Sequence, residues 1–201
     1  RLPSKTFVDP HQGLRDLMLE TLRTPAAPEI SFSDDPLRMM RAARFTSQLG
    51  FELDPAAFAA MRDMASRIEI ISAERVRDEL SKLLISKNPQ PGLELLVESG
   101  IAELVLPELP ALRLEVDEHH HHKDVYQHSL TVVAQAISLE PQYGFDRDLT
   151  LRLAALLHDI GKPATRKLEQ GGSVTFHHHD VVGAKLAKKR LTALRFDNDT
   201  I

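Results

Sequence analysis

Hydrophobic and polar positions follow one another along this chain mostly with the spacing of amphipathic helices. From Ser33 the pattern is strongly helical as far as Leu49, where Gly50 ends it, and we expect Ser33 or Asp34 to cap its start. Further helices are predicted at about 55–64, 72–84, 91–99, 124–139, 148–160 and 180–194. The chain is therefore predicted to be all-α.

Proline and glycine divide the chain into three zones. In residues 1–28, Pro25 and Pro28 are expected to form a linker, because each proline disfavours helix in the residue before it. A breaker cluster at 107–110, followed by acidic residues, marks the main boundary. The predicted domains are 1–28, 29–113 and 114–201, with a small hairpin in the third zone at 167–176.

Composition narrows the chemistry. The 201 residues include no cysteine, which excludes disulfides, thiolate metal sites and cysteine nucleophiles. A formal charge of −4 argues against a generally basic surface, but it leaves room for local basic stripes. No stretch approaches the ~18 apolar residues of a membrane span and none resembles a signal peptide, so we expect no membrane contact and a cytoplasmic location. Because the chain begins with Arg1 rather than methionine, we expect it to be a piece of a longer protein.

Nine of the ten histidines lie in the third zone, where His128 precedes the pair His158-Asp159 by one helix. Imidazole and carboxylate donors suit a divalent transition metal better than calcium. Taken alone, His158 is more simply interpreted as a cap at the end of a helix. The run His158-Asp159-Ile-Gly-Lys-Pro, with His128 a helix earlier, resembles the HD metal-dependent phosphohydrolase domain, whose pattern is His…His-Asp…Asp.

That resemblance implies that these three side chains hold a divalent metal, whose identity we leave open. It also implies a last aspartate on a later helix, to which we assign no residue. The stretch from Phe176 to Gly183 resembles a Phe-x-x-His…Gly segment of such domains, so His179 is expected to be an auxiliary or phosphate-facing residue. Lys162 is a second candidate for phosphate contact, and the run 119–122 is expected to be an exposed polar loop.

Three arginines, Arg38, Arg41 and Arg44, fall on one face of the helix predicted from Ser33. Their planar donor forks suit phosphates or base edges, although a solvated face with local ion pairs explains them as well by composition alone. The segment Asp34-Asp35-Pro-Leu-Arg38 resembles the Glu-Asp-x-x-Arg motif in the neck of class II tRNA nucleotidyltransferases, the superfamily of CCA-adding enzymes and poly(A) polymerases. The resemblance implies that Asp35 and Arg38 hydrogen-bond the Watson–Crick edge of CTP or ATP. It implies also that Arg41 and Arg44 assist with the triphosphate or with RNA.

Two further segments resemble motifs of the same superfamily. Residues 9–17, Asp-Pro-His-Gln-Gly-Leu-Arg-Asp-Leu, resemble the motif that closes the catalytic palm, and residues 74–80 resemble the motif that buttresses the templating helix. The palm of this superfamily holds two Mg²⁺ ions with an Asp-x-Asp pair. This sequence has no Asp-x-Asp in a strand context, and Asp197-Asn-Asp199 follows a helix. We therefore predict that the chain alone does not add nucleotides.

The last predicted helix is locally basic, with Lys185, Lys188, Lys189 and Arg190, and we expect it to contact RNA phosphates, although a solvated face explains it equally well. Together the resemblances imply part of an enzyme that adds CCA to tRNA 3′ ends, with tRNA, CTP and ATP as partners. They imply the order palm end, helical neck, HD domain. Two alternatives stay open: a stand-alone HD phosphohydrolase acting on nucleotides or cyclic phosphodiesters, and a non-catalytic RNA-binding module.

Overall fold

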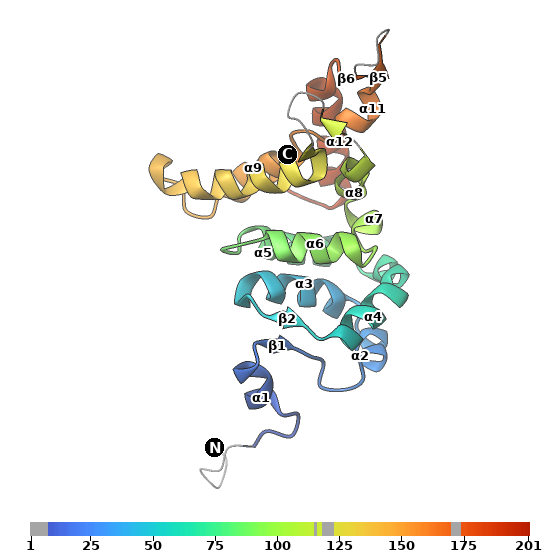
Figure 1. The fold of residues 1–201 in the computed structure, drawn as a ribbon, viewed down its shortest axis with the longest axis vertical. Helices are drawn as coiled ribbons and strands as arrows, with labels where there is room; N and C mark the ends of the chain where they lie inside the picture. Colours follow the sequence, from blue (N-terminus) through green and yellow to red (C-terminus); the bar gives the residue numbers. More distant parts are fainter. Residues whose placement is uncertain (1–7, 115, 118–122, 170–173) are drawn as a thin grey trace.

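Helices form nearly all of the regular structure in the computed structural model, which describes residues 8–114, 116–117, 123–169 and 174–201. The all-α prediction is therefore confirmed. The helices lie in successive layers, from α1 at the bottom of Figure 1 to α11 and α12 at the top. Within the described residues the strands are two-residue pairs: β1 (Thr21–Leu22) with β2 (Glu52–Leu53), β3 (Val116–Asp117) with β4 (Lys123–Asp124), and β5 (Lys167–Leu168) with β6 (Val174–Thr175). The first pair is parallel and the other two are antiparallel.

Caps fix where several helices of the N-terminal layers begin and end. Asp54 accepts hydrogen bonds from two backbone N–H groups at the start of α4, and Ser72 accepts one at the start of α5. Gly50 ends α3 in the left-handed conformation, with φ at 71°. The bounds are α1 Gly13–Met18, α2 Pro28–Asp34, α3 Leu37–Leu49, α4 Pro55–Asp63, the 3-10 helix η1 Ala65–Ile70, α5 Ala73–Leu84 and α6 Gln90–Glu98.

Pro28 begins helix α2 and does not extend a linker. Ala27 before it is extended with ψ at 137°, as proline requires of its predecessor, but proline itself suits the first position of a helix. The backbone becomes extended at Asp35, and α3 starts two residues later. The single helix expected from this region is therefore wrong in its start, because neither Ser33 nor Asp34 caps α3.

The C-terminal layers pair long helices with short connecting turns. Helices α9 and α10 pack against each other, and α9 protrudes to one side in Figure 1. The antiparallel β5–β6 pair confirms the predicted hairpin, whose glycines at 171–172 lie outside the described residues. The bounds are α7 Ala102–Val105, α8 Glu108–Ala111, the 3-10 helix η2 Leu112–Leu114, α9 Val125–Leu139, the 3-10 helix η4 Glu140–Tyr143, α10 Leu149–Leu157, α11 Lys162–Thr165 and α12 His179–Ala193.

One hydrophobic core continues across the domain boundary predicted near residue 113. Its members come from both sides: Leu80, Leu84, Leu93, Val133 and Leu156 are among them. Each such side chain contributes about 1.5–3 kcal/mol by leaving water. The two larger predicted domains therefore share a core as neighbours, and the position of their boundary stays a prediction.

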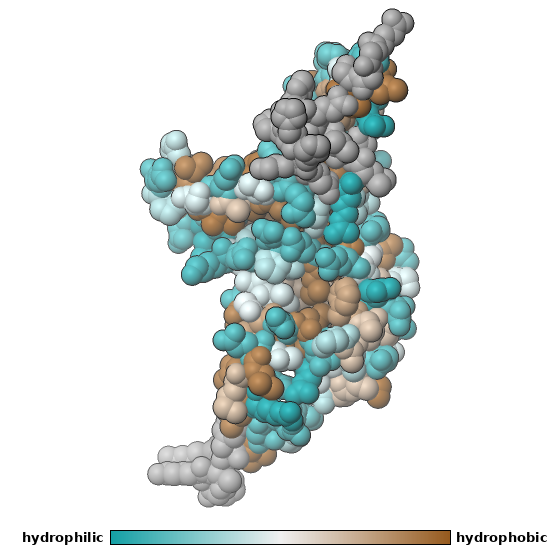
Figure 2. Space-filling model, in the orientation of Figure 1, coloured by the Kyte–Doolittle hydropathy of each residue, from teal (hydrophilic) through white to brown (hydrophobic). Residues whose placement is uncertain are grey.

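The surface is uneven at the N-terminal end. Figure 2 shows the outline indented between the protruding end of α9 and the N-terminal helices. Helix α1 has no buried residue, and its apolar side chains are exposed: Leu14, Leu17 and Met18, together with Leu19 just after it. Among the described residues, every helix falls short of the length and apolar character that crossing a membrane requires.

Candidate functional site

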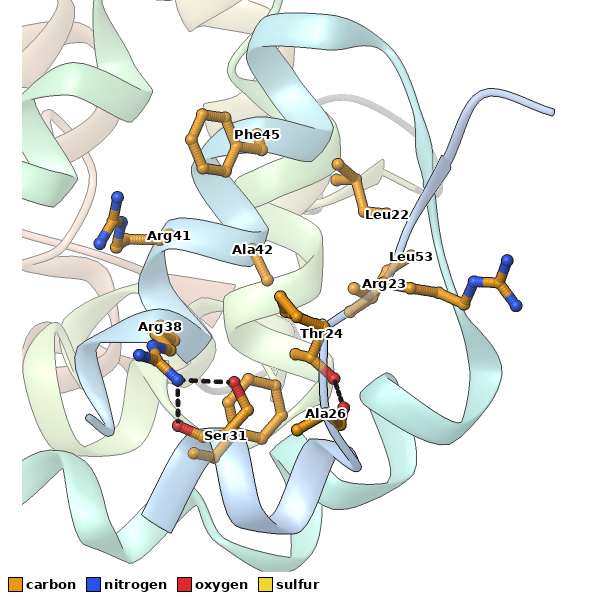
Figure 3. Close-up of a pocket in the computed structure, with 12 residues that line it drawn as sticks. Leu22, Arg23, Thr24, Ala26, Ser31, Arg38, Arg41, Ala42, Phe45 and Leu53 are labelled. Atoms are coloured by element: carbon orange, nitrogen blue, oxygen red, sulfur yellow. Dashed lines mark hydrogen bonds between the residues drawn. The ribbon is translucent and has the colours of Figure 1, made fainter. Parts of the chain in front are cut away.

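A pocket of about 540 Å³ opens between α3 and the segment of residues 22–26 (Figure 3). Phe32 and Phe45 contribute apolar walls, and Arg38 and Arg41 line it from α3. Figure 3 shows these two arginines on successive turns of α3, whereas Arg23 extends away on the far side. Apolar walls with a few placed cations suit a flat base that carries phosphate groups.

The two residues of the predicted base-reading motif lie where α2 ends and α3 begins: Asp35 between the two helices and Arg38 in the first turn of α3. Arg38 Nη1 donates to the hydroxyl oxygen of Ser31 at 2.9 Å and to its carbonyl oxygen at 3.2 Å. Asp35 Oδ1 accepts from the backbone N–H of Leu37 at 3.2 Å, which fixes the carboxylate at the first turn of α3. Contacts between near neighbours in the chain therefore help to position both side chains.

Helix α5, which carries the predicted buttressing motif, braces α3 and the residue between α2 and α3 through two ion pairs. Arg44 Nε donates to Glu79 Oε2 at 2.6 Å, and both side chains are largely enclosed. Arg75 Nη2 donates to the two carboxylate oxygens of Asp35 at 3.2 and 3.3 Å. Arg44 thus faces α5. Of the four residues predicted to bind the nucleotide, Arg38 and Arg41 line the pocket, whereas Asp35 and Arg44 pair with α5 and do not line it.

Four side chains of the third zone converge on the carboxylate of Asp159, which is 5% exposed. His158 Nε2 and Lys162 Nζ each lie 3.0 Å from Oδ2, and His128 Nε2 lies 3.8 Å from the same oxygen. His179 Nε2 lies 3.6 Å from Oδ1. Donor atoms of His128, His158 and Asp159 fall within 4.8 Å of one another, and among the described residues they are the group close enough to hold one ion.

Backbone carbonyls orient two of these imidazole rings. Nδ1 of His158 lies 2.8 Å from the carbonyl oxygen of Ala155, and Nδ1 of His179 lies 2.8 Å from that of Phe176. Because a carbonyl oxygen only accepts, each Nδ1 carries the proton, and each Nε2 is turned toward Asp159. This is the arrangement in which an imidazole binds a metal through Nε2.

The groups in the cluster shift one another's pKa values. Burial raises the pKa of Asp159, but hydrogen bonds from His158 and Lys162 outweigh that effect and bring the pKa to about 2. The hydrogen bond to Asp159 in turn raises the pKa of His158, against the opposing effect of burial. Two imidazoles and a carboxylate fit a divalent transition cation, which would take the place of the proton on His158.

Close contact between two glycines brings α12 to this cluster. A Cβ atom on Gly161 would lie 2.0 Å from the carbonyl oxygen of His179 and 2.6 Å from the backbone nitrogen of Gly183. No side chain fits that space. Gly161 and Gly183 therefore permit the close approach of α12 that places His179 beside Asp159.

The predicted RNA-binding residues of α12 divide into two groups. Lys185, Lys188 and Lys189 are exposed. Arg190 Nε instead donates to both carboxylate oxygens of Glu108 at 2.9 and 3.0 Å, which ties α12 to α8. The lysines are thus available to a partner, whereas Arg190 is engaged inside the protein.

Several residues at these sites escaped the sequence analysis. Ser31 belongs to no motif, and only the folded structure brings it to Arg38. Arg152 is the charged residue in a helix made mostly of leucine and alanine, a sequence sign of a buried charge, and it pairs with Glu140. The histidine run 119–122 lies outside the described residues. Asp197 accepts hydrogen bonds from Thr200 in a turn, which confirms that this Asp-x-Asp pair is not in a strand.

Two protein-family models match the chain. Residues 50–112 match the family described as "Probable RNA and SrmB- binding site of polymerase A". Residues 125–201 match the HD domain. The two matches fall on the two larger domains predicted from the sequence.

Curated relatives are similar over most of the chain. An A-adding tRNA nucleotidyltransferase of Deinococcus radiodurans is 39% identical over 95% of this chain and 44% of its own length. A multifunctional CCA protein of Mannheimia succiniciproducens is 35% identical over 80% of this chain and 39% of its own length. The chain thus spans less than half the length of these relatives.

A solved structure of a tRNA-processing enzyme, in its apo form 2, supports the fold. It superimposes with a TM-score of 0.65 over 97% of this chain and 47% of that one, at 19% sequence identity. The order of helical layers is therefore shared with a protein whose sequence has diverged widely.

Proposed function

This chain belongs to the tRNA nucleotidyltransferase family with an HD domain, and from that premise we propose that it is the nucleotide-selecting and RNA-holding part of an enzyme that adds CCA to tRNA 3′ ends. The observation that carries the proposal is the pocket beside α3, with Arg38 and Arg41 on its wall. Asp35 stands just before the same helix, where it accepts from the backbone N–H of Leu37, and it is not one of the residues that line the pocket. The proposed substrates are tRNA, CTP and ATP, and they imply a cytoplasmic location.

Selection rests on the donors and acceptors of the base. A carboxylate only accepts hydrogen bonds and a guanidinium only donates them, so Asp35 and Arg38 together match an edge with an amino group beside a ring acceptor. Cytosine and adenine have such an edge. Uracil places a carbonyl oxygen where the amino group should be, and two acceptors then face each other. Arg41, one turn further along α3, is positioned for the triphosphate.

The proposed domains give each segment a part in this function. Residues 1–28 end the catalytic palm, 29–113 form the neck and 114–201 form the HD domain. The exposed apolar side chains of α1, with Leu17 at 59% and Met18 at 79%, are those that a palm would cover. The Mg²⁺ carboxylates of that palm have no counterpart among the motifs of this chain, so we derive no step through those ions.

Nucleotide binding by this chain tests the proposal. CTP and ATP should bind more tightly than UTP, and Asp35→Asn or Arg38→Gln should weaken CTP binding by about tenfold or more, the loss expected for one charge-assisted hydrogen bond. Arg62→Gln, an exposed arginine on α4, is the matched control and should leave binding unchanged. Equal affinity for CTP and UTP would contradict the proposal. Incorporation of CTP into tRNA by this chain alone would contradict the assignment of catalysis to a palm outside it.

The cluster around Asp159 supports a second function, hydrolysis of phosphate esters at the HD domain. His128, His158 and Asp159 would hold a divalent cation there, with His179 and Lys162 facing the same carboxylate. A cation at this position would acidify a water molecule and polarise a phosphoryl oxygen. The chain's own part is to orient the imidazoles through backbone carbonyls and to keep the aspartate ionised.

Hydrolysis of a 2′,3′-cyclic nucleotide with Mg²⁺, Mn²⁺, Ni²⁺ or Co²⁺ tests this second function. We expect activity in the unmodified chain and its loss in His158→Ala. Inactivity with all four metals would leave the HD domain as a body that holds RNA. In that role Lys185, Lys188 and Lys189 would contact phosphates, and reversing the charge of Lys188 and Lys189 should weaken tRNA binding and flatten its salt dependence.

A further inference from the structure

Ser31 is 2% exposed on α2, and both of its oxygen atoms accept from one nitrogen of Arg38 (Figure 3). The hydroxyl oxygen lies 2.9 Å and the carbonyl oxygen 3.2 Å from Nη1. An alanine would suit the helix better, and a buried hydroxyl is costly unless it is bonded. The hydroxyl of Ser31 is therefore explained by its contact with Arg38.

These two bonds engage Nη1 and leave the other two nitrogens of the guanidinium for a ligand. A guanidinium has five N–H donors, so Nε and Nη2 keep three. Among the described residues Arg38 makes no further hydrogen bond, and its side chain lines the pocket. The anchored nitrogen thus sets the direction in which the remaining fork points.

Arg41 lines the same pocket as Arg38 but lacks a comparable anchor among the described residues. Within the described residues Arg41 has no hydrogen-bond or ion-pair partner, although it too lines the pocket and is exposed. A mobile cation is adequate for a triphosphate, which accepts from many directions. Reading a base edge requires a fixed direction, because each N–H must meet one particular atom.

We propose that Ser31 is a positioning residue, which holds the Arg38 guanidinium in the orientation that distinguishes cytosine from uracil. The inference rests on the proposed nucleotide site and deepens it. A long arginine side chain loses considerable rotamer freedom on binding, and an anchor made before binding removes part of that cost. Without the hydroxyl, the longer bond to the carbonyl oxygen of residue 31 is the anchor that remains, so the guanidinium should vary more in orientation and should donate to cytosine and uracil with less discrimination.

The test compares Ser31→Ala with Ser33→Ala, the same change at an exposed position of the same helix. Dissociation constants of CTP and UTP are measured for the full chain and for both variants. In Ser31→Ala the preference for CTP over UTP should fall about three- to tenfold, while the unfolding midpoint stays within about 4 °C, the shift expected for one hydrogen bond in a chain of this size. Ser33→Ala should preserve the preference.

Nitrogen NMR of the Arg38 side chain supplies a readout that does not depend on nucleotide. Slow exchange and hindered rotation of Nη1 are expected in the unmodified chain, and both should be weakened in Ser31→Ala, where only the carbonyl oxygen of residue 31 still accepts from Nη1. If CTP binds and the CTP-to-UTP preference is the same in all three proteins, the inference is overturned and the proposed site stands. If the unmodified chain binds no CTP, the proposed site falls and the inference falls with it.

Discussion

Arg152 is the largest of the side chains that the described core encloses fully. Its Nε and Nη2 donate to the Glu140 carboxylate at 2.6 Å, and its Nη1 donates to the carbonyl oxygens of Leu84 and Ser86 at 2.7 Å. Those carbonyls lie at the C-terminal end of α5, so one guanidinium joins α10 to the helix that braces α3. A charge is tolerated at such depth only with partners of this kind.

Glu140→Gln should therefore destabilise the protein, and the loss should depend on pH. Breaking the pair leaves Arg152 buried without its counter-charge, at a cost of about 3 kcal/mol near neutral pH. The hydrogen bond from Arg152 lowers the pKa of Glu140, against the effect of burial. Stability from this pair is then present above the ordinary glutamate pKa of about 4.3 and is lost as the pH falls through the lower folded value.

Urea denaturation of both proteins from neutral pH to about pH 3 measures this difference. The difference in the free energy of unfolding between the unmodified chain and Glu140→Gln should become smaller as the pH falls below about 4. If this difference is the same at every pH, the loss of stability comes from the shape of the side chain and not from its charge.

Metal binding at Asp159 should follow the protonation of His158. A cation must displace the proton from Nε2, and the raised pKa of His158 makes that harder as the solution becomes more acidic. Asp159, with its pKa at about 2, stays ionised throughout. Co²⁺ affinity should therefore fall about tenfold for each unit of pH below the pKa of His158.

Calorimetry with Co²⁺ checks this in a background where the histidines at 119–122 are replaced by serine, which removes a competing cluster from the titration. His158→Gln should abolish the high-affinity binding. His177→Gln, an exposed histidine close in sequence to His179, should leave it intact. Binding that persists in His158→Gln would place the metal elsewhere.

At the scale of elements, the approach of α12 to the loop after α10 depends on Gly161. Gly161→Ala would drive a Cβ atom into the backbone of His179 at 2.0 Å, so α12 must move away. We expect a loss of about 1–3 kcal/mol in the free energy of unfolding, the usual cost of overpacking, together with weaker Co²⁺ binding. Gly13→Ala, where the nearest atom is 3.4 Å from the new Cβ, is the matched control. Unchanged stability and Co²⁺ affinity in Gly161→Ala would show that α12 has freedom to shift.

Local sequence signals predicted most of the helices, and tertiary contacts account for the differences. Asp54, Ser72 and Asp148 each cap the helix that they were expected to open or precede, because a cap is a contact between near neighbours. The break at Asp35 differs from the single helix that the pattern predicts, because Pro28 begins a helix of its own instead of extending a linker. The pair of Arg44 and Glu79 joins residues 35 positions apart, and no local pattern announces it.

The same distinction holds for the candidate sites. His128, His158 and Asp159 were found because they belong to a motif, and the structure then brings their donor atoms within 4.8 Å. Ser31 reaches Arg38 only because α2 folds back beside α3, so its part depended on the structure.

At the scale of the whole molecule, we expect the shared core to make the proposed neck and HD domain one unit of stability. Buried side chains are continuous from α3 through α5 to α10, and Arg152 bonds across the same junction. In a cooperative unit, any ligand that binds only the folded state stabilises every part of it equally.

Co²⁺ bound at Asp159 should therefore slow hydrogen exchange in α3, two layers away. At a free metal concentration of about 100 times the dissociation constant, the global free energy of unfolding rises by about 2.7 kcal/mol, which is roughly a hundredfold in protection of amides that exchange by global unfolding. Amides of Met40 and Ala43 in α3 should gain that factor alongside those of Leu153 and Leu156 in α10. If only α9–α12 gained protection, the HD domain would unfold separately. The continuous core would then be an interface between two independent units, and the pocket beside α3 would keep its stability whether or not the HD domain holds a metal.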